Sequence, residues 1–342
     1  MAAGDFSVAT CNLFNLNLPG KRMYRDPDGW SQAEFDRKVS WLGARLADLD
    51  ADVIGFQELW HGDALAAVFA RDGLAGAYDL LVPATANGTR IECAAAVRKG
   101  LLRGEPRWIE TFPPGFVLSG KGDAQTPEIS VNLTGFHRPV LQFEVQPRAD
   151  GPQVLVTVCH LKSKNPTRVN REDWFEADEA RFKPHQSALG AGLSTIRRTA
   201  EATALRWILT EQMKGTVTPV IVLGDLNDGQ HSNTLNIITD QPRFLQRASA
   251  NSGGDTALYS AQALQQLRSL NDVYYTHVYQ DVRESLDHVL MSEQFYEYSA
   301  RRVWRFDYLT IDNDHLNHDD HKARGSIDHG IVKVALRYSR AN

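Results

Sequence analysis

The stretch VIVLGDLND, residues 220–228, determines the fold that we expect for this chain. Four apolar residues, typical of a buried strand, run directly into Gly224, Asp225 and Asn227. A buried strand that ends in this way delivers a carboxylate and an amide to the edge of a sheet. Because Asp225 and Asn227 are two positions apart, an extended backbone would point both side chains to the same side.

Other strand-like runs end in polar residues of the same kind. Their ends carry Asn12, Glu58, His160, Asp287 and the pair Asp328-His329. One such end means little, but six in one chain indicate a single polar site at one edge of a sheet. In the run that ends at His160, Cys159 points to the opposite face, which argues against a nucleophilic Cys-His pair.

The remaining pattern predicts alternating strands and helices. Strand-like runs cover 5–13, 52–57, 94–98, 140–145, 154–161, 220–223, 286–291 and 327–336. A capping-box pattern at 31–34 opens a helix to about Leu49, and a second long helix is expected over 194–213. No repeat, low-complexity tract or linker divides the chain. We therefore expect one α/β domain over residues 1–342, with long loops at about 113–125, 165–192 and 312–326.

The overall composition narrows the class of protein. The 342 residues include 37 Lys+Arg and 42 Asp+Glu, for a formal charge of −5. This balance argues against a sequence-independent DNA coat, but it leaves room for an enzyme that touches phosphate through a metal ion. Three widely spaced cysteines without a CxxC pair, and an N-terminus unlike a signal peptide, predict a reduced, cytoplasmic protein.

The donor types at the strand ends predict a metal. They are hard oxygens and imidazoles without clustered thiolates, a set that suits Mg²⁺ or Mn²⁺ more than structural Zn²⁺.

Taken together and in this order, the motifs resemble the endonuclease/exonuclease/phosphatase superfamily, which includes pancreatic-type deoxyribonuclease, abasic-site endonucleases, neutral sphingomyelinases and inositol polyphosphate 5-phosphatases. The resemblance runs from Asn12 to His329. It implies a deoxyribonuclease-like four-layer α/β sandwich, in which two packed mixed β-sheets are flanked by helices. Ile327 and Gly330 depart from the usual terminal motif, which leaves the subfamily open.

The resemblance also implies roles for individual residues. Asn12, Glu58 and Asp328 would hold one or two Mg²⁺ or Mn²⁺ ions. Asp225 would orient or deprotonate the attacking water, and Asn227 would support Asp225 or the phosphate. His160 and His329 would contact the scissile phosphate, with Asp287 fixing the tautomer of His329.

Three basic residues are candidates for substrate contacts. Lys162 and Lys164 follow His160 directly, and Arg138 belongs to an Arg-Pro turn similar to one in the family. A surface arginine before a strand is an equally good interpretation of Arg138.

The leading interpretation is a divalent-metal-dependent phosphodiester hydrolase that uses in-line attack of a water without a covalent intermediate. Nucleic acid is the first substrate to expect. The alternative is a phosphatase or phosphodiesterase that acts on a small phosphorylated molecule or a phospholipid headgroup. Two further interpretations are a non-catalytic scaffold and a metal-binding protein centred on the histidines of 315–321. The sequence indicates no protein partner and no membrane span.

Overall fold

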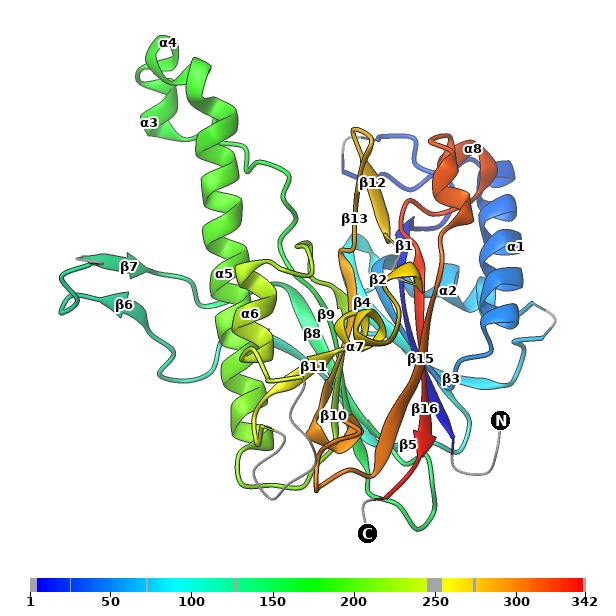
Figure 1. Ribbon diagram of the computed structural model, residues 1–342. Coiled ribbons are helices and arrows are strands. Elements are labelled where there is room, and N and C mark those ends of the chain that lie inside the picture. Colours follow the sequence, from blue (N-terminus) through cyan, green and yellow to red (C-terminus); the bar gives the residue numbers. More distant parts are fainter. Residues whose placement is uncertain are drawn as a thin grey trace.

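The computed structural model describes residues 5–24, 26–71, 73–125, 128–244, 254–272 and 275–340. Two six-stranded mixed sheets pack face to face (Figure 1). The first sheet has the order β15 (Trp304–Asp312), β16 (Ile331–Tyr338), β1 (Phe6–Leu16), β2 (Val53–His61), β4 (Asn87–Arg98) and β3 (Tyr78–Leu81). The second has the order β11 (Leu258–Ser260), β14 (Asp287–Ser292), β10 (Val220–Asp225), β9 (Val154–His160), β8 (Gly135–Val145) and β5 (Leu102–Thr111).

Helices cover the outer face of each sheet and complete four layers. On the first sheet lie α1 (Gln32–Leu49) and α2 (Gly62–Phe69), and on the second lie α5 (Gln186–Met213) and α6 (Asn233–Thr239). A further helix, α7 (Ala261–Arg268), contacts β14 and β15 at the edge of the sandwich. The predicted four-layer α/β sandwich is therefore confirmed.

The central core lies between the two sheets and brings their strands close together. It consists of alternate side chains of the facing strands, such as Val8, Val156 and Val289, all fully buried. At Gly55 of β2 an added Cβ would lie only 2.9 Å from Val158 of β9. The glycine therefore permits the close approach of β2 to the second sheet.

Strand register sets the position of the polar strand ends. Asp225, the last residue of β10, pairs with His160 on the parallel neighbour β9 and with Asp287 on the antiparallel neighbour β14. In the other sheet β1 and β2 are also parallel, so Asn12 and Gln57 are register partners. His160 and Asp225 end β9 and β10. Asn12 and Gln57 instead lie within β1 and β2, just before the register between these two strands shifts. These residues meet at one edge of the sandwich, as the sequence predicts.

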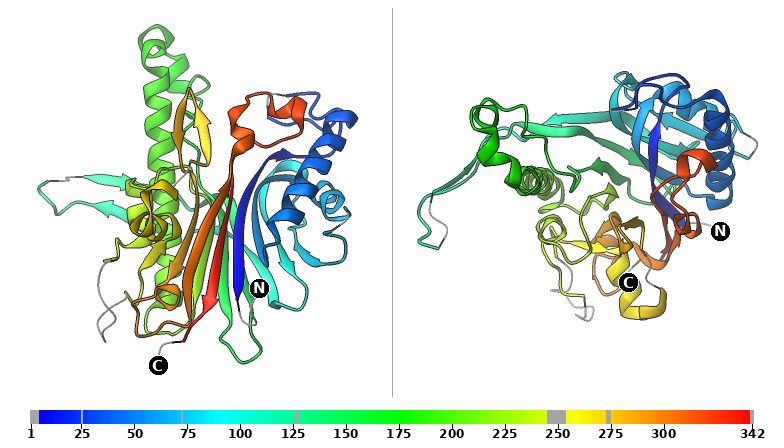
Figure 2. Two further views of the ribbon diagram at one scale, coloured as in Figure 1. Left: turned by 45° about the vertical axis from the view of Figure 1, so that its right-hand side comes forward. Right: turned by 90° about the horizontal axis from the view of Figure 1, so that it is seen from above.

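Short elements complete the chain around this edge. The hairpin of β12 (His277–Tyr279) and β13 (Val282–Glu284) stands there together with α8 (His321–Arg324), as Figure 2 shows. The other short elements are α3 (Asp173–Glu176), α4 (Glu179–Phe182), η1 (Lys183–His185), β6 (Leu118–Gly120), β7 (Ile129–Val131), η2 (Leu270–Asp272), η3 (Glu293–Phe295) and η4 (Asp314–Asn317).

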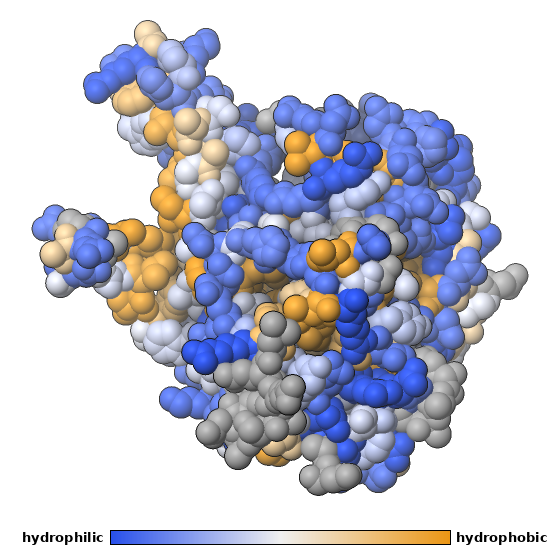
Figure 3. Space-filling view, in the orientation of Figure 1, coloured by the Kyte–Doolittle hydropathy of each residue, from blue (hydrophilic) through white to orange (hydrophobic). Residues whose placement is uncertain are grey.

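The N-terminal half of α5 and the β6–β7 hairpin project from the body of the molecule (Figure 1). Figure 3 shows apolar side chains along this part of α5. Leu189, Leu193 and Ile196 are exposed there at helical spacing. None of the described helices is both long enough and apolar enough to cross a bilayer.

Several of the expected elements and loops differ in their bounds or contents. The helix expected from Ser194 begins at Gln186, so Ser194 lies inside it, and its hydroxyl donates to the Asn165 carbonyl at 2.8 Å. The expected loops at 165–192 and 312–326 contain short helices, and 113–125 contains β6. Finally, β16 begins at Ile331 instead of residue 327, which leaves Asp328 and His329 on an irregular segment.

Gly224, next to Asp225, lies where the backbone leaves no room for a side chain, and this leads to a prediction about stability. Its φ is +150°, and an added Cβ would overlap the Cys159 carbonyl oxygen of β9. We expect Gly224→Ala to destabilise the fold by about 2 kcal/mol or more, because backbone atoms must move apart. Urea unfolding measures this, with Gly192→Ala as the control, since nothing lies within 4 Å of that position on α5. Equal stability of the two variants would contradict the prediction.

Candidate active site

Asp225 lies at the centre of the polar edge and is almost completely buried. Its Oδ2 accepts a hydrogen bond from Asn12 Nδ2 at 3.2 Å. The same oxygen lies 3.4 Å from His160 Nε2 and 4.0 Å from His329 Nε2. Side chains from β1, β9 and the segment before β16 therefore converge on the carboxylate at the end of β10.

Asp287 fixes the orientation of His329. Asp287 Oδ2 lies 2.7 Å from His329 Nδ1, and the carboxylate is fully buried. A proton on Nδ1 serves this bond, so Nε2 faces Asp225. Burial alone would lower the pKa of His329, but the charge of Asp287 and its hydrogen bond raise that pKa well above its usual value.

His160 lies in the opposite electrostatic environment. It is buried, and burial followed by the positive charge of Arg138 lowers the pKa of His160 well below its usual value. The Asp225 carboxyl therefore lies between a neutral imidazole and one that favours its cationic form. Burial, reinforced by the charge of Asp287, raises the pKa of Asp225 to about 7 despite the opposing charge of His329.

Asn227 does not follow the extended geometry expected from its spacing. Its φ of 53° lies in the left-handed region, because β10 ends at Asp225 and the chain turns. The Asn227 backbone N–H donates to Asp225 Oδ1 at 2.8 Å, and its side-chain Nδ2 donates to the Leu161 carbonyl at 3.0 Å. The contact with Asp225 thus comes from the backbone of Asn227, while its side chain braces the turn after β9.

The three expected metal ligands lie beside this centre. Asn12 hydrogen-bonds Glu58, and Glu58 Oε2 accepts from the Asn15 N–H at 3.0 Å. Burial and then the charge of Asp328 raise the pKa of Glu58, so the two carboxylates repel each other. Asp328 Oδ1 is buried and hydrogen-bonds no group in the described chain. A divalent cation would satisfy this oxygen and offset the repulsion, so these residues fit a metal.

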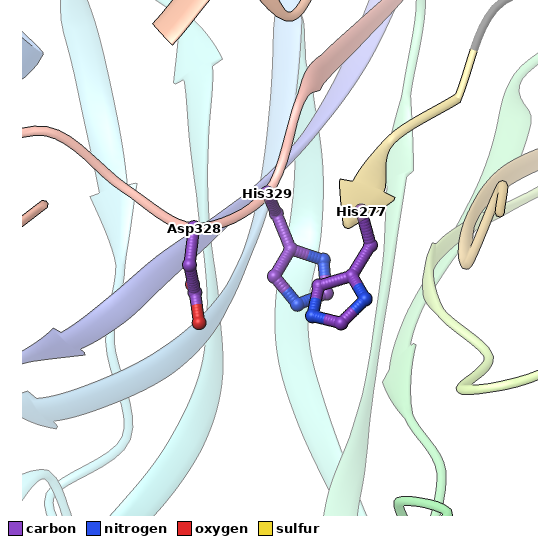
Figure 4. Close-up of side chains that lie close together, drawn as sticks. All are labelled: His277, Asp328 and His329. Atoms are coloured by element: carbon purple, nitrogen blue, oxygen red, sulfur yellow. The ribbon is translucent and has the colours of Figure 1, made fainter. Parts of the chain in front are cut away.

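Among the described residues, two groups of side chains offer donor atoms within 4.8 Å of one another. One consists of Asp225, Asp287 and His329, and the other of His277, Asp328 and His329 (Figure 4). His277, from β12, was not expected at the site. No spacing rule places it there, because it reaches His329 through an isolated bridge between segments far apart in the sequence.

The basic residues expected to bind substrate lie in different environments. Arg138 is nearly buried and donates from Nη1 to the Leu161 carbonyl at 2.9 Å, so it supports the turn that carries His160. Lys162 Nζ donates to the Asn165 carbonyl at 3.0 Å, within its own loop. Lys164 forms an ion pair with Glu284 at 2.7 Å. The structure therefore holds both lysines in contacts with the protein.

The histidines of 315–321 brace the site. His315 Nε2 lies 2.7 Å from the His329 carbonyl oxygen, and His321 Nδ1 lies 2.9 Å from Ser326 Oγ. His318 is exposed. These three do not form a metal-binding group among the described residues. The loop instead fastens the irregular segment that carries Asp328 and His329.

Sequence reasoning missed two further features of the site. A cavity of about 440 Å³ lies beside Arg138 and is lined by Tyr24, Trp60 and the arginines Arg22 and Arg90, among others. The residues that line this cavity come from loops and strands without a common motif. The cluster of basic residues at 21–25 is the one sequence signal that points to the cavity. Lys38, fully buried on α1, lies 4.7 Å from the ring of Trp30 and donates to the Ser326 carbonyl at 3.4 Å. It sits in the apolar stripe of a helix, where a core residue is expected.

Comparisons with known proteins identify the family and the fold. The model of the Endonuclease/Exonuclease/phosphatase family matches residues 14–309. The chain therefore belongs to this family, whose members are phosphoester hydrolases that depend on divalent metals. No curated protein matches the sequence significantly.

Solved structures share the fold at low sequence identity. Danio rerio TDP2 complexed with single strand DNA product is 14% identical, with a TM-score of 0.56 over 97% of this chain and 99% of that one. The human Nocturnin catalytic domain with bound sulfate anion is 15% identical, with a TM-score of 0.54 over 98% and 95%. The Bacteroides thetaiotaomicron mannosyl-6-phosphatase is 15% identical, with a TM-score of 0.50 over 97% and 100%. At this identity the likeness shows the fold alone.

The raised pKa of Asp225 predicts how the stability of the fold depends on pH. The folded value of about 7 lies above the value of about 3.9 for an unfolded chain, so stability falls as pH rises between them. In chelator at pH 8 we expect Asp225→Asn to be more stable than the original chain, by on the order of 1 kcal/mol. The gain should vanish near pH 4. Urea unfolding at both pH values measures it.

Asp228→Asn is the matched control. Burial opposes ionisation of Asp228, but the hydrogen bond from Thr234 and the charge of Arg198 lower its pKa overall. This substitution should therefore reduce stability at pH 8. A loss of stability in the Asp225 variant at pH 8 would contradict the electrostatic description of the site.

Proposed function

We propose that this chain is a divalent-metal-dependent phosphodiester hydrolase that acts on nucleic acid by in-line attack of a water, without a covalent intermediate. One observation carries the proposal: the buried Asp225 carboxylate lies within 4.0 Å of two imidazoles in opposite charge environments. Near neutral pH, hydrolysis of a phosphodiester needs one group that accepts a proton and another that donates one. Groups whose environments push their pKa values apart can fill these two roles.

The proposed roles follow from the contacts. Asp225, with a pKa of about 7, orients the attacking water and accepts its proton. His329, held by Asp287, presents Nε2–H to a phosphoryl oxygen, and the neutral His160 contacts the phosphate from the other side. Asn227 holds the Asp225 carboxylate through its backbone N–H.

Asn12, Glu58 and Asp328 would hold the metal, Mg²⁺ or Mn²⁺. When bound, the ion supplies positive charge to a phosphoryl oxygen and to the leaving group. Lys38 lies near Asp328 and Glu58, whose charges favour its protonated form, although burial lowers the pKa of Lys38 to about 7.

The cavity beside the site supports nucleic acid over a small phosphoester. Its arginines suit a polyanionic backbone, and the half-exposed ring of Tyr24 packs edge-on against Trp60 with centroids 5.0 Å apart. An aromatic face beside a phosphate site can stack a nucleobase. The alternative function is a phosphatase for a small phosphorylated molecule or a lipid headgroup. The mannosyl-6-phosphatase, which has the same fold, supports this alternative. Three buried free thiols suit the cytoplasmic location that the sequence predicts.

The catalytic roles are tested by two substitutions. We expect Asp225→Ala and His329→Ala each to reduce phosphodiester hydrolysis by at least about 100-fold while the chain stays folded, since general acid–base groups contribute about 10²–10⁴-fold. Turnover of bis-p-nitrophenyl phosphate, plasmid DNA, single-stranded DNA and RNA measures this. Chelator should abolish activity, and Mg²⁺ or Mn²⁺ should restore it. Unchanged activity in either folded variant would reject the assignment.

Tyr24→Ala distinguishes the two substrate classes. If the Tyr24 ring stacks a base, its loss should raise KM for single-stranded DNA by roughly 5- to 100-fold, which corresponds to about 1–3 kcal/mol per stacked base. Hydrolysis of bis-p-nitrophenyl phosphate should change little. The control is Tyr308→Ala, because Tyr308 is similarly exposed on β15 and does not line the cavity. An equal effect on both substrates would favour the small-molecule alternative.

A further inference from the structure

We propose that His277, Asp328 and His329 form a second metal site, one that selects a transition-metal ion such as Zn²⁺ over Mg²⁺. Each side chain offers a donor atom, and these atoms lie within 4.8 Å of one another. Figure 4 shows the two imidazole rings side by side, with the Asp328 carboxylate next to them. The site shares Asp328 and His329 with the proposed hydrolase site, but binding of the ion does not depend on hydrolysis.

The backbone places His277 firmly. The Gly330 N–H donates to the Thr276 carbonyl at 2.7 Å, and His277 and His329 form an isolated antiparallel bridge. Thr276 is fully buried, and its hydroxyl accepts from the Leu286 and Asp287 N–H groups at 2.9 and 3.2 Å. The hairpin that carries His277 is therefore fastened both to the strand of Asp287 and to the segment of His329.

The imidazoles are arranged for ligation. Their ring centroids are 4.8 Å apart with planes tilted by 44°. His329 Nδ1 is bonded to Asp287, which leaves Nε2 as the donor atom that faces the site. Zn²⁺ would replace the proton on Nε2, so binding of this ion and the phosphate contact of Nε2–H are alternative states of the same atom. A carboxylate that holds the far nitrogen of a ligating histidine is the usual support of a protein metal site, because it fixes the ring and raises its basicity. Asp287 already occupies that position.

The third ligand also has an unsatisfied atom. Asp328 Oδ1 is buried and without a hydrogen-bond partner among the described residues. Asp225 Oδ2, 4.0 Å from His329 Nε2, adds negative charge at the same place. A site that combines buried carboxylate oxygen with two nitrogens, under surrounding negative charge, attracts a divalent cation.

The types of donor atom determine which cation the site prefers. Two imidazoles and one carboxylate, with a position left open, match the ligand set of open zinc sites. Mg²⁺ prefers oxygen ligands and keeps its waters, whereas imidazole suits Zn²⁺, Co²⁺ and similar ions. The set of Asn12, Glu58 and Asp328 is rich in oxygen and suits Mg²⁺. The active-site edge therefore offers two neighbouring positions with different metal preferences.

The test measures metal binding without substrate. The full chain is freed of metal with chelator and titrated with Zn²⁺ by calorimetry, and with Co²⁺ by its visible absorbance. We expect His277→Ala to weaken Zn²⁺ binding by at least about 100-fold, because even the outer partners of ligands contribute about 10- to 100-fold. Excess Mg²⁺ should displace little of the Zn²⁺ from the original chain.

Three variants make the result unambiguous. His318→Ala, which removes an exposed histidine of the 312–326 loop, should bind Zn²⁺ as the original chain does. Glu58→Gln, which removes a carboxylate of the oxygen-rich set, should keep the Zn²⁺ site. His277→Gln repeats the test with a side chain closer in size, in case His277→Ala does not fold.

Two results would overturn the inference: equal Zn²⁺ affinity of the folded His277 variants and the original chain, or loss of the Zn²⁺ site in Glu58→Gln alone. Failure of the proposed hydrolase function gives a different pattern, in which Zn²⁺ binding by His277 is retained but no phosphodiester is cleaved with Mg²⁺.

Discussion

The site depends on the burial of one carboxylate, Asp225, at the end of β10. Strand register places His160 on one side of it and Asp287 on the other, so its neighbours are fixed by backbone hydrogen bonds of the sheet. Burial raises the pKa of Asp225 and of Glu58, and a charge that remains buried needs a partner. The pairing of Asp287 with His329 provides one such partner. The repulsion between Glu58 and Asp328 leaves a place for a cation.

Much of the surrounding structure supports the segment that carries Asp328 and His329. This segment is irregular and would not hold two functional side chains by itself. His315 contacts the His329 carbonyl, His321 contacts Ser326, and Lys38 donates to the Ser326 carbonyl. The loop that suggested a separate metal site in the sequence thus supports the candidate active site. The second metal site that we propose uses His277 instead, which lies on the β12–β13 hairpin and not in that loop.

The sequence predicted the fold and the convergence of strand ends, because both follow from local patterns. Apolar runs that end at Asn12, Glu58, His160 and Asp225 are visible in the chain, and parallel strands bring such ends together. It did not predict the left-handed turn at Asn227 or the ion pair of Lys164 with Glu284, because both depend on tertiary contacts. His277 and the aromatic cavity were missed for the same reason. The capping box at Ser31 and Glu34, which is purely local, is confirmed.

We infer that the fold holds the two imidazoles beside Asp225 in opposite charge states. Nitrogen NMR of the histidine rings in the metal-free protein tests it directly, with His160→Gln and His329→Gln used to assign the signals. We expect the His329 ring, with Nδ1–H bonded to Asp287, to titrate at a pKa well above that of an ordinary histidine, and the His160 ring to titrate at a pKa well below it. If both rings titrated together near their ordinary pKa of about 6.5, the proposed electrostatic arrangement would be wrong.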